Sequence, residues 1–536
     1  MKSAKRVAVV GAGASGLTCI KCCLDEDLEP TCFERSDDIG GLWNYQENSS
    51  EDKVSIYKSL TVNTSKEMMC YSDFPIPADY PNFMSHSKIL QYFRLYAKNF
   101  DLMQYIRLKT NVCSITKQKD FPSTGQWSVT TKDSDGNVLT SSFDAIMICT
   151  GHHCYPHLPL DSFPGIKEFK GQYMHSKEYK IPQPFEGKRV VVIGIGNSGG
   201  DLAVEISRCA EQVFLSTRRG AWILNRVAEE GFPVDMMIIR RSTQVLRDTM
   251  LPSILTWRLQ RRQNSKFNHA NFGLQPTHSI FSQHPTVNDE LPNRIMSGTL
   301  LVKPNVKEFT KTAAIFEDGS VEEVDVVVFA TGYTFSYPCL DESVIKVHKN
   351  QVQLYKHVFP PQMEQPTLFV IGLIQPLGAI MPLSELQSRW ATRVFKGFIK
   401  LPTVPDMMSD IMQKKERMEK RYVKSRRHTI QVDFVPYADE LAEQIGVKPD
   451  VMRLFLRDPR LAYLVFFGPF TPYQYRLNGP GKWEKARETI LTQWERTINV
   501  TKTRTVVKCQ NDVSLPLLLK LLAVFCSICA VCFLFL

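Results

Sequence analysis

The sequence predicts an α/β protein built from two similar units, followed by an apolar helix at the C-terminus. Three observations support this fold class. An apolar strand followed by a glycine-rich turn occurs twice, a later strand ending in Thr-Gly also occurs twice, and the last residues form one long apolar stretch. With 536 residues, of which 22% are charged and 10% aromatic, the chain can form several packed domains and is not disordered.

The glycine-rich repeat is the strongest signal. Each copy predicts a buried parallel strand, a tight turn and the start of a helix, whose N-terminus can stabilise a pyrophosphate. The sequence therefore predicts two Rossmann-like dinucleotide-binding domains. Basic residues before the first copy imitate a signal peptide, but cleavage would discard the phosphate-binding loop. The copies are KRVAVVGAGASG, with Gly11, Gly13 and Gly16, and KRVVVIGIGNSG, with Gly194, Gly196 and Gly199.

The end of the second strand differs between the two units. Glu34 lies 23 residues after the first glycine of its loop, where a carboxylate can hydrogen-bond ribose hydroxyls. The same count in the second unit gives Thr217, followed by Arg218 and Arg219. A hydroxyl and guanidinium groups suit a 2′-phosphate, which favours NADPH over NADH. A solvated arginine pair is the alternative interpretation.

A second repeat closes each unit. The strands of 144–151 and 325–332 both begin at Asp and end in Thr-Gly, and each follows a hairpin signal, Asp135-Gly136 or Asp318-Gly319. A strand that ends in Thr-Gly lets the backbone approach a flat ligand. Two dinucleotide folds in one chain are typical of a flavoprotein reduced by a nicotinamide, with FAD in the first loop and NADPH in the second.

The repeats also predict the domain boundaries. An FAD-binding domain would comprise 1–153 and 332–445, with an NADPH-binding domain at 154–331 inserted in it. Within the latter, 222–296 exceeds a minimal dinucleotide fold and is interpreted as a substrate-channel or membrane-surface insertion, or as a solvated helix pair. Gly and Pro predict a loop-rich cap segment at 446–512.

The cysteines argue against disulfide exchange. No cysteine lies between Cys32 and Cys70, although the segment DIGGLW within that stretch should reach the flavin. Cys19, Cys22 and Cys23 fall on the first predicted helix, where core packing is the expected role. A pyridine nucleotide–disulfide reductase is therefore disfavoured.

The linker before the second loop reads FKGQYMHSKEY and matches the pattern F-x-G-x3-H-x3-Y. Together with DIGGLW, NTSKEMMCYSDFP and FATGY, it makes the chain resemble the flavin-containing monooxygenases over nearly its whole length. The resemblance implies FAD, NADPH, O2 and a small lipophilic substrate, with a C4a-hydroperoxyflavin as the oxygenating species. It also implies a location at the endoplasmic reticulum membrane, facing the cytosol.

Site residues follow from the same resemblance. Asn63 would be the active-site asparagine that hydrogen-bonds the flavin–oxygen adduct, although alone it would suggest a helix cap or turn. Asn197 would shape the second loop. No metal site is predicted. Predicted FAD contacts are Gly11, Ala12, Gly13, Ala14, Ser15, Gly16, Glu34, Gly41, Leu42, Trp43, Asn63, Thr64 and Gly332. Predicted NADP contacts are Val62, Gly194, Gly196, Asn197, Ser198, Gly199, Gly200, Asp201, Thr217 and Arg218.

Two segments, RRGAWILNRV (218–227) and SQHPTVND (282–289), resemble the Baeyer–Villiger-type branch of the family most closely. This likeness makes His284 a second catalytic candidate, with a surface-loop histidine as the alternative. The predicted reaction is the oxidation of ketones to esters or lactones. Alternatives are oxygenation of soft nitrogen or sulfur, an NADPH oxidase that releases H2O2, and a membrane flavoprotein scaffold without turnover.

The C-terminus and the net charge of +10 point to a membrane. Leu515 to Leu536 contain one charge, Lys520, and would span about 33 Å as a helix, so an anchor is predicted at 513–536, with a buried terminal helix as the alternative. The positive charge is concentrated in 236–270 and 411–428. Anionic lipid headgroups explain these patches better than nucleic acid, for which no binding motif is present. A homo-oligomer is possible.

Overall fold

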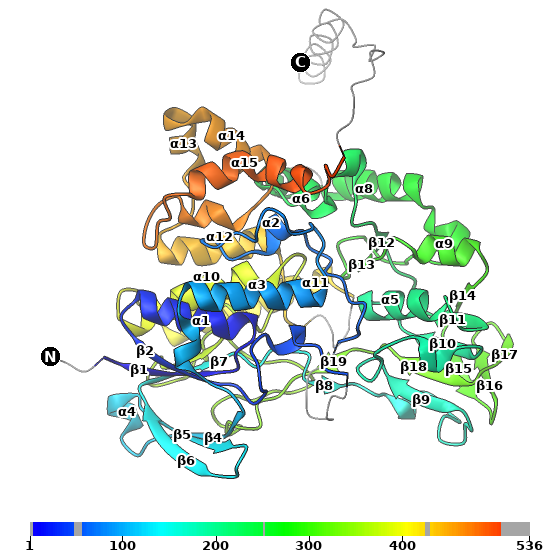
Figure 1. Cartoon of the computed structure of the whole chain (residues 1–536), viewed down its shortest axis with the longest axis horizontal. Coiled ribbons are helices and arrows are strands. Elements are labelled where there is room, and N and C mark those ends of the chain that lie inside the picture. The colour runs from blue at the N-terminus through cyan, green and yellow to red at the C-terminus, as the bar shows by residue number, and fades with distance from the viewer. Residues whose placement is uncertain (1–3, 48–55, 250–251, 424–428, 505–536) are drawn as a thin grey trace, which may run out of the picture.

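The structure is a computed structural model that describes residues 4–47, 56–249, 252–423 and 429–504. Its centre consists of two five-stranded sheets of parallel strands (Figure 1). The first has the order β20-β7-β1-β2-β3 and the second β14-β11-β10-β18-β9. The strands are β1 (Arg6–Val10), β2 (Glu29–Phe33), β3 (Ile106–Arg107), β7 (Ala145–Ile148), β20 (Leu368–Val370), β9 (Gln172–His175), β10 (Arg189–Ile193), β11 (Gln212–Ser216), β14 (Leu300–Lys303) and β18 (Val326–Phe329).

Alternation along β1 gives the first sheet two buried faces. Val7 and Val9 pack in a cluster that includes residues of α1 (Ala14–Asp25), α3 (His86–Asn99) and α10 (Ile380–Phe395). Ala8 and Val10 pack on the other face, against an antiparallel sheet. Successive strand side chains point to opposite faces, so an unbroken apolar run is what a doubly covered strand requires. That antiparallel sheet consists of β4 (Thr110–Lys117), β5 (Trp127–Asp133) and β6 (Val138–Phe143).

The second sheet repeats this arrangement. Val190 and Val192 of β10 pack in a cluster with Leu202 and Ile206 of α5 (Asn197–Ile206). The alternate residues of β10 face a second antiparallel sheet. The hairpins predicted at Asp135-Gly136 and Asp318-Gly319 are confirmed, since β5–β6 and β16–β17 pair antiparallel there. The second antiparallel sheet consists of β15 (Val306–Phe309), β16 (Ala313–Phe316) and β17 (Val321–Glu323).

The chain passes from the first unit to the second and later returns, and these two passages, here called the crossing, lie side by side. β8 (Tyr155–Pro156) and β19 (Tyr333–Thr334) run antiparallel to each other where the chain leaves the first unit and where it returns. Two further short pairs are β12 (Ile223–Leu224) with β13 (Thr286–Val287), and β21 (Gln375–Pro376) with β22 (Gln431–Val432). The first of these lies inside the insertion at 222–296 and bears on the second glycine loop.

The remaining helices cover the upper part of the molecule as drawn and its flanks (Figure 1). Within its described residues, the segment predicted as a loop-rich cap contains the helices α13, α14 and α15, and its longest loop is 468–485, where most of its glycines and prolines lie. The remaining helices are α2 (Lys66–Met69), α4 (Phe121–Thr124), α6 (Val234–Ile238), α7 (Arg241–Thr249), α8 (Pro252–Lys266), α9 (Leu291–Met296), α11 (Val404–Arg421), α12 (Phe434–Ile445), α13 (Val451–Arg457), α14 (Pro459–Phe467) and α15 (Ala486–Asn499).

The predicted fold class also contained a C-terminal transmembrane helix, and this part is corrected. No helix within the described ranges is both long enough and apolar enough to cross a membrane. The longest of them, α11, has 18 residues but carries acidic and basic side chains along much of its length. The predicted anchor at 513–536 lies outside the described residues. The described chain therefore supports the two α/β units and no membrane-spanning element.

Several cations of the two predicted basic patches are neutralised by carboxylates from other elements. In the first patch Arg241 of α7 forms an ion pair with Asp439 of α12. In the second, Lys414 of α11 lies 2.6 Å from a carboxylate oxygen of Glu440. These patches are therefore less positive than their sequences suggest, and contact with lipid headgroups stays a prediction.

Candidate active site

The first glycine loop connects β1 to α1 and has no room for larger residues. Gly11 has φ +101°, and a Cβ there would lie 2.9 Å from the carbonyl oxygen of Cys149. A Cβ on Gly16 would lie 1.8 Å from the carbonyl oxygen of Gly11. No side chain caps α1, and its first turn has no acidic residue. The backbone N–H groups at this helix end therefore suit a phosphate.

The second loop, between β10 and α5, has the same backbone shape. Gly194 has φ +107°, and a Cβ on Gly199 would lie 1.9 Å from the carbonyl oxygen of Gly194. The N-terminus of α5 also lacks a side-chain cap. The two sequence repeats thus fold into two matching cradles for a dinucleotide pyrophosphate.

The ends of β2 and β11 differ as the sequence predicts. Glu34 is buried, and its carboxylate accepts hydrogen bonds from the backbone N–H of Ala12 at 2.7 Å and from the N–H and hydroxyl of Ser36 at 2.9 and 2.6 Å. A carboxylate offers about four acceptor positions, so capacity remains for a ribose hydroxyl. Arg218 is exposed, and no carboxylate of the described chain forms an ion pair with it.

Other predicted FAD contacts surround the first loop. Gly41, Leu42 and Trp43 form a single helical turn whose Gly41 Cα lies 3.7 Å from the Cβ position of Gly13. Two further groups at this loop have protein partners. The Ala14 carbonyl accepts a hydrogen bond from the Tyr71 hydroxyl at 2.6 Å, and the hydroxyls of Ser15 and Ser384 lie 3.0 Å apart.

Gly332 lies elsewhere. It follows β18 of the second unit, and its carbonyl accepts hydrogen bonds from the backbone N–H of His157 and from Nε2 of His175. Its position is therefore at the crossing between the two units. His175 belongs to the F-x-G-x3-H-x3-Y pattern, and desolvation lowers its pKa to about 4, so its ring is neutral at physiological pH.

Asn63 lies on a loop that is fixed on both sides. The N–H of Val62 donates to the Met84 carbonyl at 2.9 Å, and the N–H of Ser65 donates to Asp235 at 2.7 Å. Val62 is buried in the core, and Thr64 is half-buried. Asn63 is not the cap of α2, since Ser65 holds that position. Its side-chain oxygen is buried without a hydrogen-bond partner in the described structure. Such an orphaned amide is costly unless a ligand completes it.

The residues after the second loop hold parts of the protein together. The Asn197 side-chain oxygen accepts a hydrogen bond from the N–H of Val287 at 2.8 Å. Asp201 accepts hydrogen bonds from the Tyr57 hydroxyl at 2.5 Å and from the Asn288 amide at 2.8 Å, and burial raises its pKa. Asp201 therefore has structural partners on both oxygens. Ser198 is half-buried at the helix start, and Gly200 packs against Thr286.

His284 is half-buried and stands two residues before β13, on the segment that reaches Asn197 through Val287. The contact with the second loop is made by Val287, three residues later, so both interpretations of His284 stay open. A catalytic role for His284 stays a prediction.

Sequence reasoning missed Asp235. It comes from the insertion and is buried. It accepts a hydrogen bond from Ser65, 170 positions earlier in the chain, in the loop 62–65 that carries Asn63 and is called the asparagine loop below. A signal was available, because this acid is the only charge in the run FPVDMMII. A lone carboxylate within an apolar run needs hydrogen-bond partners when it is buried.

The cysteine cluster of α1 has the predicted packing role. Cys19, Cys22 and Cys23 are buried, and burial raises the pKa of the Cys22 and Cys23 thiols. High thiol pKa values disfavour the thiolate that disulfide exchange needs.

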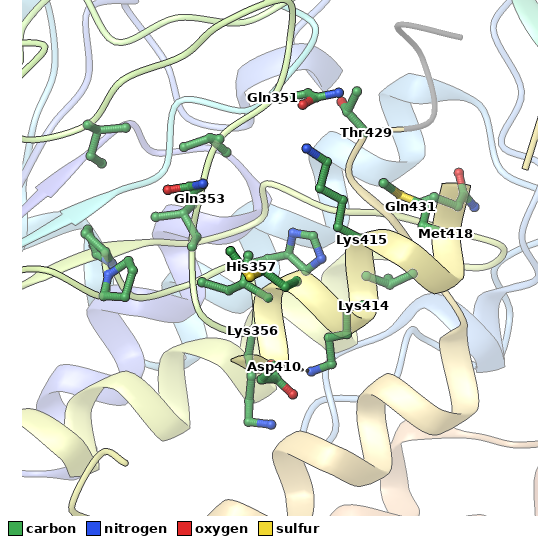
Figure 2. A pocket seen from close by; sticks show the side chains of 18 of the residues that line it. Gln351, Gln353, Lys356, His357, Asp410, Lys414, Lys415, Met418, Thr429 and Gln431 are labelled. Carbon is green, nitrogen blue, oxygen red and sulfur yellow. Dashed lines mark ion pairs between the residues drawn. The ribbon is translucent and has the colours of Figure 1, made fainter. Parts of the chain in front are cut away.

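A cavity of about 940 Å³ lies between α11, α12 and the segment 342–363, away from the predicted nucleotide contacts (Figure 2). Lys356, Lys414 and Asp410 lie together beneath the ring of His357 in this view. Both lysines form ion pairs with Glu440, and Lys414 also pairs with Asp410. The charges at this end of the cavity therefore largely cancel, and none of the predicted site residues lines it.

Two uncapped glycine cradles, a carboxylate at the end of β2, an open guanidinium after β11 and an orphaned buried amide together fit FAD and NADPH. These features define an oxidoreductase that binds two dinucleotides.

The chain belongs to the flavin-binding monooxygenase-like family, whose model matches residues 4–536. It is 60% identical over 512 residues to flavin-containing monooxygenase 5 of Rattus norvegicus, covering 95% of this chain and 96% of that protein. Accordingly it is an NADPH-dependent flavin-containing monooxygenase that uses FAD, NADPH, O2 and a substrate.

Solved structures agree on the fold. S-allyl-L-cysteine S-oxygenase from Allium sativum superimposes with a TM-score of 0.64 at 25% identity, covering 92% of this chain and 99% of that one. Cyclohexanone monooxygenase from Rhodococcus sp. Phi1 bound to NADP+ superimposes with a TM-score of 0.57 at 17% identity, covering 83% and 98%.

Proposed function

We propose that the first glycine loop binds FAD, that the second binds NADPH, and that the chain inserts oxygen beside a carbonyl group. The balanced reaction is ketone + O2 + NADPH + H+ giving ester or lactone + NADP+ + H2O. One oxygen atom enters the C–C bond next to the carbonyl, and the other leaves as water, formed with the hydride equivalent of NADPH (two electrons and one proton) and one further proton.

One observation carries the choice of a carbonyl substrate. The two segments that resemble the Baeyer–Villiger-type branch lie together, because β12 of the first pairs with β13 of the second. The pair is attached to the second loop through Asn197 and Val287. A neighbouring contact joins the Thr286 hydroxyl to the Ile195 carbonyl. Residues that resemble the branch thus lie together next to the second glycine loop, and this supports the proposal of a carbonyl substrate.

When bound, FAD and NADPH supply hydride transfer and the activation of O2. The protein supplies position, hydrogen bonds and exclusion of water. Asn63 would offer its amide to the bound flavin and oxygen, since its buried side-chain oxygen has no competing partner in the described chain. Val62, Met68 and Met236 belong to the apolar core cluster of the first unit, and such surroundings would limit the access of water to Asn63.

Specificity for NADPH over NADH rests on the exposed residues that follow β11. The hydroxyl of Thr217 accepts a hydrogen bond from the N–H of Gly220 at 3.2 Å, which fixes the turn that presents Arg218. A guanidinium at this position can bind a 2′-phosphate through a charge-assisted pair. On this proposal Glu34 selects the ribose of FAD at the corresponding place in the first unit.

Product analysis tests the reaction. Purified enzyme with NADPH and O2 is given a simple aliphatic ketone and, separately, a tertiary amine, and ester, N-oxide, H2O2 and NADPH are quantified. Ester formed in proportion to NADPH supports the proposal, whereas N-oxide without ester contradicts it. The S-oxygenase among the similar structures makes heteroatom oxygenation the second candidate. Peroxide equal to the NADPH consumed, without any product, would indicate an oxidase. Location at the endoplasmic reticulum membrane stays a prediction.

A further inference from the structure

Asp235, in the first turn of α6, belongs to the insertion of the second unit and is only 6% exposed. Three hydrogen bonds satisfy its carboxylate. Oδ2 accepts from the backbone N–H of Ser65 at 2.7 Å and from the Ser65 hydroxyl at 3.0 Å, and Oδ1 accepts from the N–H of Met236 at 2.9 Å. Two of the three bonds therefore come from the loop of the first unit that carries Asn63.

The bond to Ser65 replaces a more common role for that residue. Ser65 is fully buried at the N-cap of α2, where a serine side chain ordinarily accepts a bond from the helix backbone. Here its side chain makes no capping bond and donates to Asp235 instead. The local sequence alone would cap the helix, so the position of this loop depends on a distant carboxylate.

The asparagine loop has few other anchors. On one side the N–H of Val62 bonds to the Met84 carbonyl, and on the other the N–H of Lys66 bonds to the Asn82 carbonyl at 3.0 Å. Asn63 and Thr64 span the gap between Val62 and Ser65. Asp235 therefore holds the end of the loop nearest to the asparagine on its C-terminal side.

α6 is itself rigidly placed. Met236 is fully buried in the core cluster of the first unit, and its sulfur lies 3.4 Å from the Thr497 hydroxyl. The N–H of Val234 donates to the Arg226 carbonyl at 2.8 Å, and the carbonyl of Ile239 accepts from the N–H of Phe470 at 3.0 Å. A carboxylate on such a support can transmit the position of the insertion to the reacting centre.

We infer that Asp235 is a positioning residue for oxygen transfer, and that the insertion serves to hold the Asn63 amide against the reacting oxygen. This inference rests on the proposed role of Asn63. It assigns the insertion a catalytic purpose apart from any substrate channel or membrane contact. Loss of the carboxylate should release Asn63, admit water and divert electrons from NADPH into H2O2. Hydride transfer from NADPH to the flavin should continue.

The test compares Asp235→Ala and Asp235→Asn with the wild type and with Asp439→Asn as a control. Asp439 also bonds the insertion, through Arg241, and also accepts from the Tyr475 hydroxyl, but it does not contact the asparagine loop. Two quantities are measured: the anaerobic rate of flavin reduction by NADPH, and the ratio of H2O2 to oxygenated product in air.

Asp235→Ala should raise the ratio of H2O2 to product about tenfold, with flavin reduction unchanged within about twofold. Asp235→Asn keeps an acceptor oxygen for the Ser65 N–H and should fall between it and the wild type. Asp439→Asn should keep the wild-type ratio. An unchanged ratio in Asp235→Ala would overturn the inference, and so would an equal rise in the control.

If Asp235→Ala does not retain flavin, Asp235→Glu takes its place, because it keeps the charge but displaces the oxygens by one methylene. A raised ratio with normal reduction supports the inference, and a wild-type ratio overturns it. The ratio is measured with whichever substrate the wild type oxygenates, ketone or amine. Failure of the carbonyl proposal is thereby separated from failure of this one.

Discussion

The two glycine loops have the same backbone conformation but differ in the residues that surround them. At the first loop the surroundings belong to its own unit: Glu34 and Gly40 both bond to the backbone of Ala12. At the second loop Val287 of the same unit bonds to Asn197, but Tyr57 of the first unit bonds to Asp201 of α5, and the end of β11 stays open with Arg218 exposed.

This difference matches the two kinds of ligand. A cofactor that stays bound through many turnovers benefits from a closed site whose hydrogen bonds are made by buried groups. A nucleotide that must enter and leave in each cycle needs an open site with a strong, solvent-accessible charge for its phosphate. On the proposed assignment of FAD and NADPH, one backbone motif serves retention or exchange, depending on the side chains at the end of the second strand.

The largest effect is expected for Gly16→Ala, which attacks the closed loop. The new Cβ would lie 1.8 Å from the backbone oxygen of Gly11, so the turn must open. We expect purified protein without bound FAD and therefore without activity, measured as flavin absorbance per chain. Gly136→Asn is the control, since a Cβ there meets nothing within 4 Å and asparagine tolerates the left-handed backbone at φ +87°. Wild-type flavin content in Gly16→Ala would show that the loop does not hold FAD.

The next effect concerns Asp235, which joins the two units. Burial raises its pKa from 3.8 to about 6, so the folded state retains the proton more strongly than the unfolded state. This stabilisation is full below pH 4 and is lost as the pH rises through 6. The free energy of unfolding of the wild type should therefore fall by about 3 kcal/mol relative to Asp235→Asn between pH 4 and pH 7.

Thermal midpoints of both proteins across that range provide the measurement. Since Asp235→Asn cannot titrate at this position, the difference between the two curves isolates Asp235 from other acids. Parallel curves would mean that the carboxylate is not buried as the structure shows.

The smallest effect is expected for Arg218→Ala at the open site. Loss of a partly screened pair with the 2′-phosphate should raise the KM for NADPH about tenfold, or about 1.4 kcal/mol, with little change in kcat. The KM for NADH should not change, because NADH lacks that phosphate. Arg218→Lys keeps the charge without the planar fork and should lie between. Equal effects on both nucleotides would show that Arg218 does not read the phosphate.

Local patterns predicted most of the fold. Local sequence determines the two glycine loops, the two Asp-Gly hairpins and the apolar strands β1 and β10. These features depend on neighbouring residues and can therefore be predicted from the sequence. The location of Gly332 at the crossing between the two units could not be predicted, because it depends on hydrogen bonds from His157 and from His175 of β9, which lie far earlier in the chain.

The candidate site was predictable only in part. Glu34 and Thr217 follow from counting along a repeated motif, whereas Asn63 was identified by resemblance. Asp235 was missed, because its partner Ser65 lies 170 positions away and no periodicity links them. Asp201 accepts hydrogen bonds from Tyr57 and Asn288, and these contacts likewise depend on packing between elements and not on local sequence.

The proposed binding of FAD by the first loop and of NADPH by the second is tested most directly by Gly199→Ala. The new Cβ would lie 1.9 Å from the backbone oxygen of Gly194, so its main clash matches the one expected at Gly16. We expect wild-type FAD content together with a decrease of about a hundredfold in the anaerobic rate of flavin reduction by NADPH. Loss of FAD from this variant, or reduction at the wild-type rate, would contradict the assignment of NADPH to the second loop.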